Sequence, residues 1–120
     1  MIEQILDFPD NVLGFSANGT VTVSDYETVI IPAVEAMLSK HPKVRLFYHL
    51  GEDFSGFEMA ALWEDTKIGL KHLTSWDRIA VVTDVDWIRA AMKVFSFLLP
   101  GHIRIFHNNE LGPARKWVIE

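Results

Sequence analysis

Histidine, aspartate and serine, the side-chain types of nucleophilic catalysis, occur close together at His49, Asp53 and Ser55. A hydrolase nucleophile needs a base within hydrogen-bond reach and a sharp turn that exposes its hydroxyl group. Ser55 is not part of a Gly-x-Ser-x-Gly motif, and Asp53 on the same tight turn does not supply that geometry. We therefore predict that the chain is not an enzyme.

The other titratable residues form no metal or phosphate motif. The chain has no cysteine, and four histidines lack a metal-ligand spacing such as His-x-x-x-His: His41, His72, His102 and His107. Asp84 and Asp86 flank a predicted strand end and are explained as helix caps. There is no glycine-rich phosphate loop. We expect neither a metal ion nor a cofactor.

Aromatic and cationic residues are better suited to a ligand pocket. Trp63 and Lys67 lie one turn apart on a predicted helix, with His72 further along. Trp87 begins the next helix, and His49 is near the carboxyl end of its strand, where open α/β sheets bind ligands. Such a wall would hold an apolar molecule with an anionic head. The alternative is that the tryptophans are core residues and Lys67 is solvated.

Five apolar runs bounded by turn residues predict the strands that position these residues: Ile2–Leu6, Val12–Ala17, Val44–Leu50, Ile79–Thr83 and His102–Phe106. Between and after them, apolar residues three or four apart predict helices that begin at Ser24, at Ser55, at Asp84 or Asp86, and at Asn109 or Glu110. Ser24 with Glu27, and Ser55 with Glu58, have capping-box spacing. Pro32 should kink the first helix.

The resulting order, ββαβαβαβα, predicts an α/β fold. Strands that alternate with helices pair in parallel through right-handed crossovers. The first strand reaches the second through the short turn at residues 7–11, so these two should pair antiparallel at one edge. We therefore expect a mixed, mostly parallel five-stranded sheet, with residues 1–120 forming a single domain.

Several stretches of the chain resemble the SpoIIAA-like group, a branch of the STAS-domain family made of small single-domain bacterial proteins of uncharacterised function. Asp53-Phe54-Ser55-Gly56-Phe57 is similar to the Asp-x-Ser-Gly turn of STAS domains. The resemblance extends through Asp65, His72, Arg78–Asp84, Trp87, Arg104–Phe106 and Ala114–Val118. It implies a STAS fold, which is also similar to the CRAL-TRIO lipid-binding domains, and a regulatory or ligand-binding role.

By the same resemblance, Asp53, Ser55 and Gly56 match a regulatory site in which the serine at a helix N-terminus is phosphorylated. A helix N-terminus would stabilise a phosphoserine. Ser55 could equally be a plain helix cap. Glu58 favours the cap, because its carboxylate would repel a phosphate.

The predicted helix 86–99 is apolar over most of its circumference, which is unusual for a surface helix. One helix can bury only one side against a sheet, so the other side needs an oligomer partner, a membrane surface or a ligand. Its contact residues would be Ile88, Arg89, Met92, Lys93, Phe95, Leu98 and Leu99. Arg89 and Lys93 lie one turn apart and suit anionic headgroups. Burial in a homo-oligomer is the other expectation.

Composition limits the function further. The formal net charge is −5, with 49% hydrophobic residues, which excludes the basic footprint of a nucleic-acid binder. No run reaches the length of a membrane span, and we detect no signal peptide, so we expect a cytoplasmic protein, with peripheral contact at the inner membrane face. We predict a non-enzymatic domain that binds a small apolar or lipid-like ligand. A protein–protein regulator resembling anti-sigma-factor antagonists is the alternative.

Overall fold

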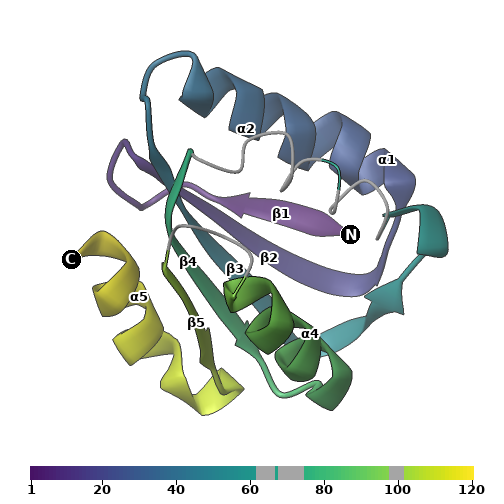
Figure 1. The fold of residues 1–120 in the computed structure, drawn as a ribbon. Helices are drawn as coiled ribbons and strands as arrows, with labels where there is room; N and C mark the ends of the chain where they lie inside the picture. Colours follow the sequence, from purple (N-terminus) through teal and green to yellow (C-terminus); the bar gives the residue numbers. More distant parts are fainter. Residues whose placement is uncertain (62–66, 68–74, 98–101) are drawn as a thin grey trace.

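The computed structural model describes residues 1–61, 67, 75–97 and 102–120. Its centre is a five-stranded sheet in the order β1-β2-β3-β4-β5 (Figure 1). The strands are β1 Ile2–Ile5, β2 Val12–Val21, β3 Val44–Phe57, β4 Trp76–Thr83 and β5 His102–Phe106. β1 pairs antiparallel with β2, and the other neighbours pair in parallel. The predicted mixed, mostly parallel sheet is confirmed.

β3 continues through residues 51–57, beyond the predicted strand Val44–Leu50. Polar residues and two glycines made this stretch read as a turn. β2 is also longer than predicted, and its last residues Thr20 and Val21 pair with Gly56 and Phe57. This pairing uses backbone groups that a loop would leave to water. Gly56 has a φ of 146°, a conformation open to glycine.

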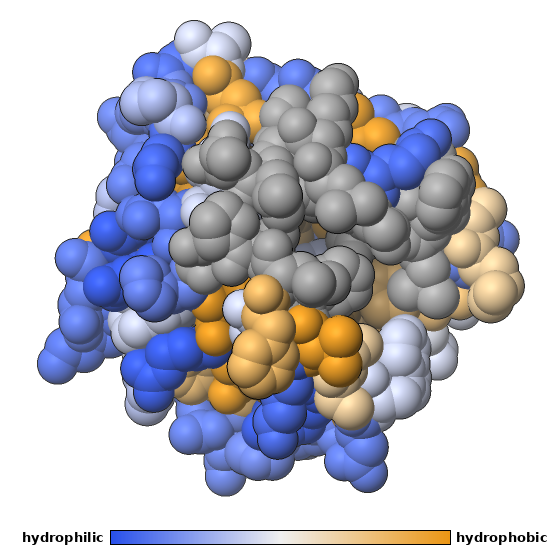
Figure 2. Space-filling model, viewed as in Figure 1, coloured by the Kyte–Doolittle hydropathy of each residue, from blue (hydrophilic) through white to orange (hydrophobic). Residues whose placement is uncertain are grey.

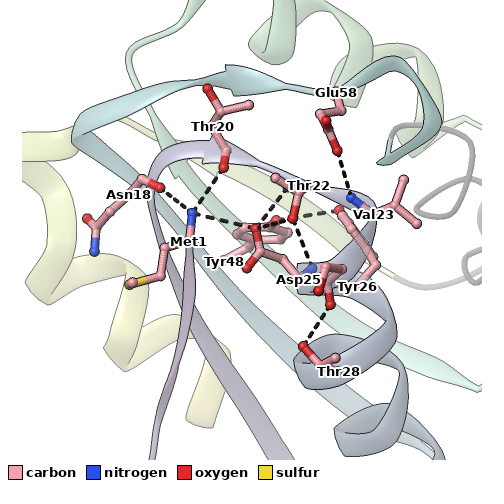
Figure 3. Close-up of polar contacts among 11 residues, drawn as sticks. Met1, Asn18, Thr20, Thr22, Val23, Asp25, Tyr26, Thr28, Tyr48 and Glu58 are labelled. Atoms are coloured by element: carbon pink, nitrogen blue, oxygen red, sulfur yellow. Dashed lines mark hydrogen bonds and ion pairs between the residues drawn. The ribbon is translucent and has the colours of Figure 1, made fainter.

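The first helical region begins at Thr22, two residues before the predicted Ser24 (Figure 3). The Thr22 hydroxyl accepts a hydrogen bond from the Asp25 N–H at 3.2 Å, and the Asp25 carboxylate accepts from the Thr22 N–H at 2.8 Å. The Asp25 carboxylate is also 3.5 Å from the Met1 amino group, which donates to the carbonyl of Asn18 at 2.6 Å. The predicted Ser24–Glu27 capping box is therefore wrong.

The kink expected at Pro32 takes the form of a change in helix type. The region consists of α1 Val23–Asp25, a π-helical turn at Tyr26–Ile30 and α2 Ile31–Leu38, with the proline in the first turn of α2. Proline cannot donate to the carbonyl four residues back. The π-helical turn comes directly before the turn that contains Pro32, where the missing proline N–H interrupts the α-helical hydrogen-bond pattern.

Two clusters of buried side chains fill the two faces of the sheet. On one face Tyr26, Ile30 and Val34 of the first helical region pack against the strands. The opposite face is covered by α5, Leu111–Ile119, through Ala114 and Val118. A short 3₁₀ turn, Asn108–Glu110, precedes α5. The helical region therefore begins within one or two residues of the predicted start at Asn109 or Glu110.

The third predicted helix is α4, Asp86–Ser96. Its residue Ile88 is buried in the same cluster as Tyr26, so α4 covers the same face as the first helical region. The edge strand β5 runs between α4 and α5 (Figure 1). Residues 59–61 are helical, so that helix begins after β3 and not at Ser55.

Candidate functional site

The outer face of α4 exposes large apolar side chains. Trp87 is 51% exposed, Val94 63% and Phe97 88%. Trp87, the exposed Ala90 and Val94 recur at a spacing of three or four residues, so they lie along one side of the helix, and Phe97 follows in the turn that ends it, where its N–H donates to the Val94 carbonyl at 3.2 Å. We call Trp87, Ala90, Val94 and Phe97 the α4 stripe. Figure 2 shows hydrophobic residues gathered over α4, bordered by hydrophilic ones.

The inner face of α4 is held by apolar packing and by Thr83. Ile88 is buried, and Met92 packs partly buried against the same cluster. The Thr83 hydroxyl accepts from the Val85 N–H at 3.1 Å, and the Thr83 carbonyl accepts from the Arg89 guanidinium at 3.0 Å. Arg89 is therefore committed to anchoring the helix, whereas Lys93 is exposed beside the α4 stripe.

The other residues predicted to contact a membrane or an oligomer partner are either not described or face the core. Leu98 and Leu99 lie outside the described residues, and only the helical backbone of Phe95 is described. Ile88 and Met92 face the core. The exposed part of the predicted surface thus shifts to Trp87, Val94 and Phe97. Across the described ranges, no helix is long and apolar enough to cross a bilayer.

His49 and Trp87, which we predicted to line one pocket, lie on opposite faces of the sheet and do not share a site. Phe47 packs in the α5 cluster, whereas Tyr48 and Leu50 pack in the other. Side chains alternate along a strand, so His49 points to the α5 face. α4 and Trp87 lie on the other face. Trp63 and His72 are outside the described residues, and Lys67 is exposed.

A groove at the opposite edge of the sheet is lined by both apolar and polar side chains. It has a volume of about 450 Å³ and lies between β1, the turn after it and α2. Ile5, Phe8, Leu13, Ala33 and Met37 form its apolar walls, and its polar lining includes Gln4, Asp10, Lys40 and His41. No sequence pattern indicates this groove, because its walls come from elements that meet only in the folded chain.

The predicted regulatory residues Asp53, Ser55 and Gly56 are part of β3 and not of a helix N-terminus. Ser55 is exposed on the strand. The Glu58 carboxylate, which we expected to cap a helix with Ser55, instead accepts a hydrogen bond from the Val23 N–H at 3.1 Å (Figure 3). The helix-dipole stabilisation expected for a phosphate at Ser55 is therefore not available in this geometry.

Asp84, just after β4, links the carboxyl ends of β4 and β5 through hydrogen bonds to the residues that follow β5. Its carboxylate lies 3.0 Å from the His107 Nδ1 and accepts from the Asn108 N–H at 3.1 Å. These hydrogen bonds, that of Asn108 first, lower the pKa of Asp84. Asp84 thus tethers the start of the C-terminal helical region instead of capping α4. Among the described residues, no group of histidine and acidic side chains could hold a metal ion.

A family comparison identifies the architecture. The SpoIIAA-like family model matches residues 12–119. The chain belongs to the SpoIIAA-like family. The crystal structure of an uncharacterized DUF3478-family protein with a SpoIIAA-like fold, from Shewanella loihica PV-4, superposes on it with a TM-score of 0.79 at 26% identity. The match covers 98% of this chain and 93% of that one.

No protein of curated function matches the chain significantly. Family membership confirms the resemblance seen in the sequence and the fold that it implied. A SpoIIAA-like fold does not specify a ligand, because function depends on the sites that a fold carries. The α4 stripe and the groove beside β1 are therefore the features on which a function must be argued.

Proposed function

We propose that this SpoIIAA-like protein is a non-enzymatic module that binds lipid, and that the α4 stripe is its contact with an anionic membrane surface. The observation that carries this proposal is the exposure of Trp87, Val94 and Phe97 on one side of a helix whose other side is packed. Contiguous exposed apolar surface of this kind marks an interaction site.

The composition of the α4 stripe suits the boundary between headgroups and acyl chains. Tryptophan and phenylalanine bury large rings there, and the indole N–H keeps a polar contact. Fully burying a valine or phenylalanine side chain contributes about 1.5–3 kcal/mol. Lys93 lies exposed next to the stripe and would add attraction to anionic headgroups. The binding should therefore depend on both apolar contact and salt.

Vesicle flotation tests the proposal. The protein is mixed with phosphatidylcholine vesicles containing phosphatidylglycerol, and with vesicles of phosphatidylcholine alone. We expect flotation with the anionic vesicles, and its loss in Phe97→Glu. Ile119→Glu is the matched control, since Ile119 is 48% exposed and lies on α5, on the opposite face of the sheet from α4. Equal flotation of the two variants would remove α4 from the membrane contact.

A second copy of the chain is the competing occupant of the α4 stripe. Light scattering after gel filtration distinguishes the two, because a homodimer gives twice the mass of 13.7 kDa. A dimer that Phe97→Glu dissociates, together with vesicle binding that the substitution leaves unchanged, would assign the stripe to self-association and contradict the lipid proposal.

The groove beside β1 is the site that we propose for a single apolar or lipid-like molecule. Its apolar walls fit the apolar body of such a molecule, and Lys40 is available to an anionic head, although the lining also contains the carboxylate of Asp10. Native mass spectrometry of the purified protein should show a retained lipid. Ala36→Trp, which narrows the groove, should reduce retention, whereas Ser24→Trp outside it should not. Equal retention in both variants would place the ligand elsewhere.

A further inference from the structure

A second cavity lies beside the edge strand β5 and is cationic, although the whole chain carries a net charge of −5. Its volume is about 310 Å³, at the small end of the range for ligand pockets. We call it the arginine pocket, and its described lining residues are Arg78, Ser96, His102, Ile103, Arg104 and Trp117. They come from β4, the end of α4, β5 and the end of α5, and none of them carries a carboxylate.

The Trp117 ring orders both guanidinium groups of the pocket. The central guanidinium carbon lies 5.1 Å from the ring centroid in Arg78 and 5.4 Å in Arg104. Cation–π contacts at such distances are attractive. A long side chain that is already held loses less conformational freedom when it binds a ligand. The two positive charges are therefore arranged before any ligand arrives.

The hydrogen-bonding capacity of the two arginines is largely unused. Arg78 donates from one terminal nitrogen to the Trp117 carbonyl at 2.8 Å, which caps the end of α5. Arg104 is exposed, and the described part of the chain provides it with ring contacts but with no hydrogen-bond acceptor or carboxylate. In contrast, Arg45 and Arg115 pair with Asp77 and Asp7 at 2.9 Å and 2.8 Å.

We propose that the arginine pocket binds the phosphate group of a phosphate ester. A guanidinium group matches phosphate oxygens with paired N–H donors, and two arginines balance an anion of two charges. Ile103 and Trp117 give the rest of the ligand an apolar wall. The phosphate can belong to a soluble ester or to a phospholipid headgroup, because Ser96 places the pocket at the end of α4.

Two titrations separate these sources. The first follows the tryptophan fluorescence and the amide NMR signals of Trp117 and other residues around the pocket during addition of sodium pyrophosphate, a soluble phosphate probe. The second measures flotation with phosphatidylcholine vesicles that contain phosphatidic acid. Each is done on the wild type, on Arg104→Gln, and on Lys43→Gln, which removes an exposed charge that lines neither cavity. Thermal unfolding verifies that each variant is folded.

We expect Arg104→Gln to weaken phosphate binding by tenfold or more, as for the loss of a charge-assisted hydrogen bond, and Lys43→Gln to change it by less than twofold. Binding of pyrophosphate supports a soluble ester, and binding of phosphatidic acid vesicles alone supports a headgroup, provided that Arg104→Gln reduces it. Equal effects of the two substitutions, or no binding of either probe, would overturn the proposal. Phe97→Glu should leave pyrophosphate binding intact, which separates the arginine pocket from the membrane proposal.

Discussion

The Trp87 ring meets the Phe57 ring edge to face, with the ring centroids 6.3 Å apart and the ring planes at 76°. Phe57 is the last residue of β3 and Trp87 is in the first turn of α4. The extension of β3 beyond its predicted end is therefore what supports the start of the α4 stripe. A shorter strand would leave Trp87 without this aromatic neighbour.

A double-mutant cycle of Phe57→Leu and Trp87→Leu should reveal this contact. We expect a coupling of about 0.5–1.5 kcal/mol in the free energy of unfolding, the usual contribution of an edge-to-face pair. Urea denaturation measures it. Phe57→Leu combined with Trp117→Leu is the control, because Trp117 packs on the α5 side of the sheet and the two changes should be additive. An additive result for Phe57 and Trp87 would show that the contact is energetically unimportant.

The helix cap is tested by comparing Thr22→Ala with Ser24→Ala. Thr22 accepts the Asp25 N–H, whereas the Ser24 side chain is exposed and makes no hydrogen bond within the described part of the chain. Thr22→Ala should lower the free energy of unfolding by about 1 kcal/mol, and Ser24→Ala should change it by less than about 0.5 kcal/mol. The reverse order would restore the Ser24–Glu27 cap that the sequence suggested.

Alanine substitutions at Gly14 and Gly112 should have opposite effects on stability. A Cβ at Gly14 would lie 2.5 Å from the Phe8 ring, which packs on Phe47 with centroids 5.1 Å apart. We expect Gly14→Ala to destabilise by about 1–3 kcal/mol. Gly112 is in α5 with nothing within 4 Å of its Cβ position, so Gly112→Ala should stabilise by up to about 1 kcal/mol. Thermal unfolding compares them, and an unchanged melting temperature for Gly14→Ala would show that Phe8 moves freely.

Burial of His49 should make stability depend on pH. Burial lowers the pKa of His49 below the ordinary histidine value of about 6.5. Below that value the unfolded chain binds a proton at His49 that the folded chain resists, so the free energy of unfolding should fall as the pH decreases from about 6.5. The decrease ends once the folded state is protonated as well.

His49→Gln should remove this part of the pH dependence, as measured by urea denaturation between about pH 7 and pH 5. Wild type and variant with the same slope over this interval would show that His49 is hydrated in the folded protein. Carboxylates with a lowered pKa, such as Asp84, become protonated only at more acidic pH. They therefore do not contribute to the difference between the wild type and His49→Gln in this interval.

Phosphorylation at Ser55 is tested by Ser55→Asp. Because Ser55 is exposed on β3, the substitution should change the free energy of unfolding by less than about 0.5 kcal/mol. We expect vesicle flotation and oligomeric state to remain those of the wild type. A large change in either one would support the regulatory hypothesis, since an acidic side chain at this position would then act as a switch.

The order of elements and the mixed sheet could be predicted from the sequence, because each depends on local pattern. Val44–Leu50 and Ile79–Thr83 are apolar runs typical of buried parallel strands, and both are strands in the structure. The excess of apolar residues in α4 also predicted an exposed apolar face, which Trp87, Val94 and Phe97 provide.

Only the tertiary structure decided how these elements meet. The far end of β3 reads as a loop in isolation, and pairing with β2 is what makes it a strand. The alternation along β3 sends His49 away from Trp87, a result that depends on which face each helix covers. The arginine pocket joins residues up to thirty-nine positions apart, such as Arg78 and Trp117. Contacts of this range leave no mark on local spacing, because they are fixed by the packing of whole elements and not by neighbouring side chains.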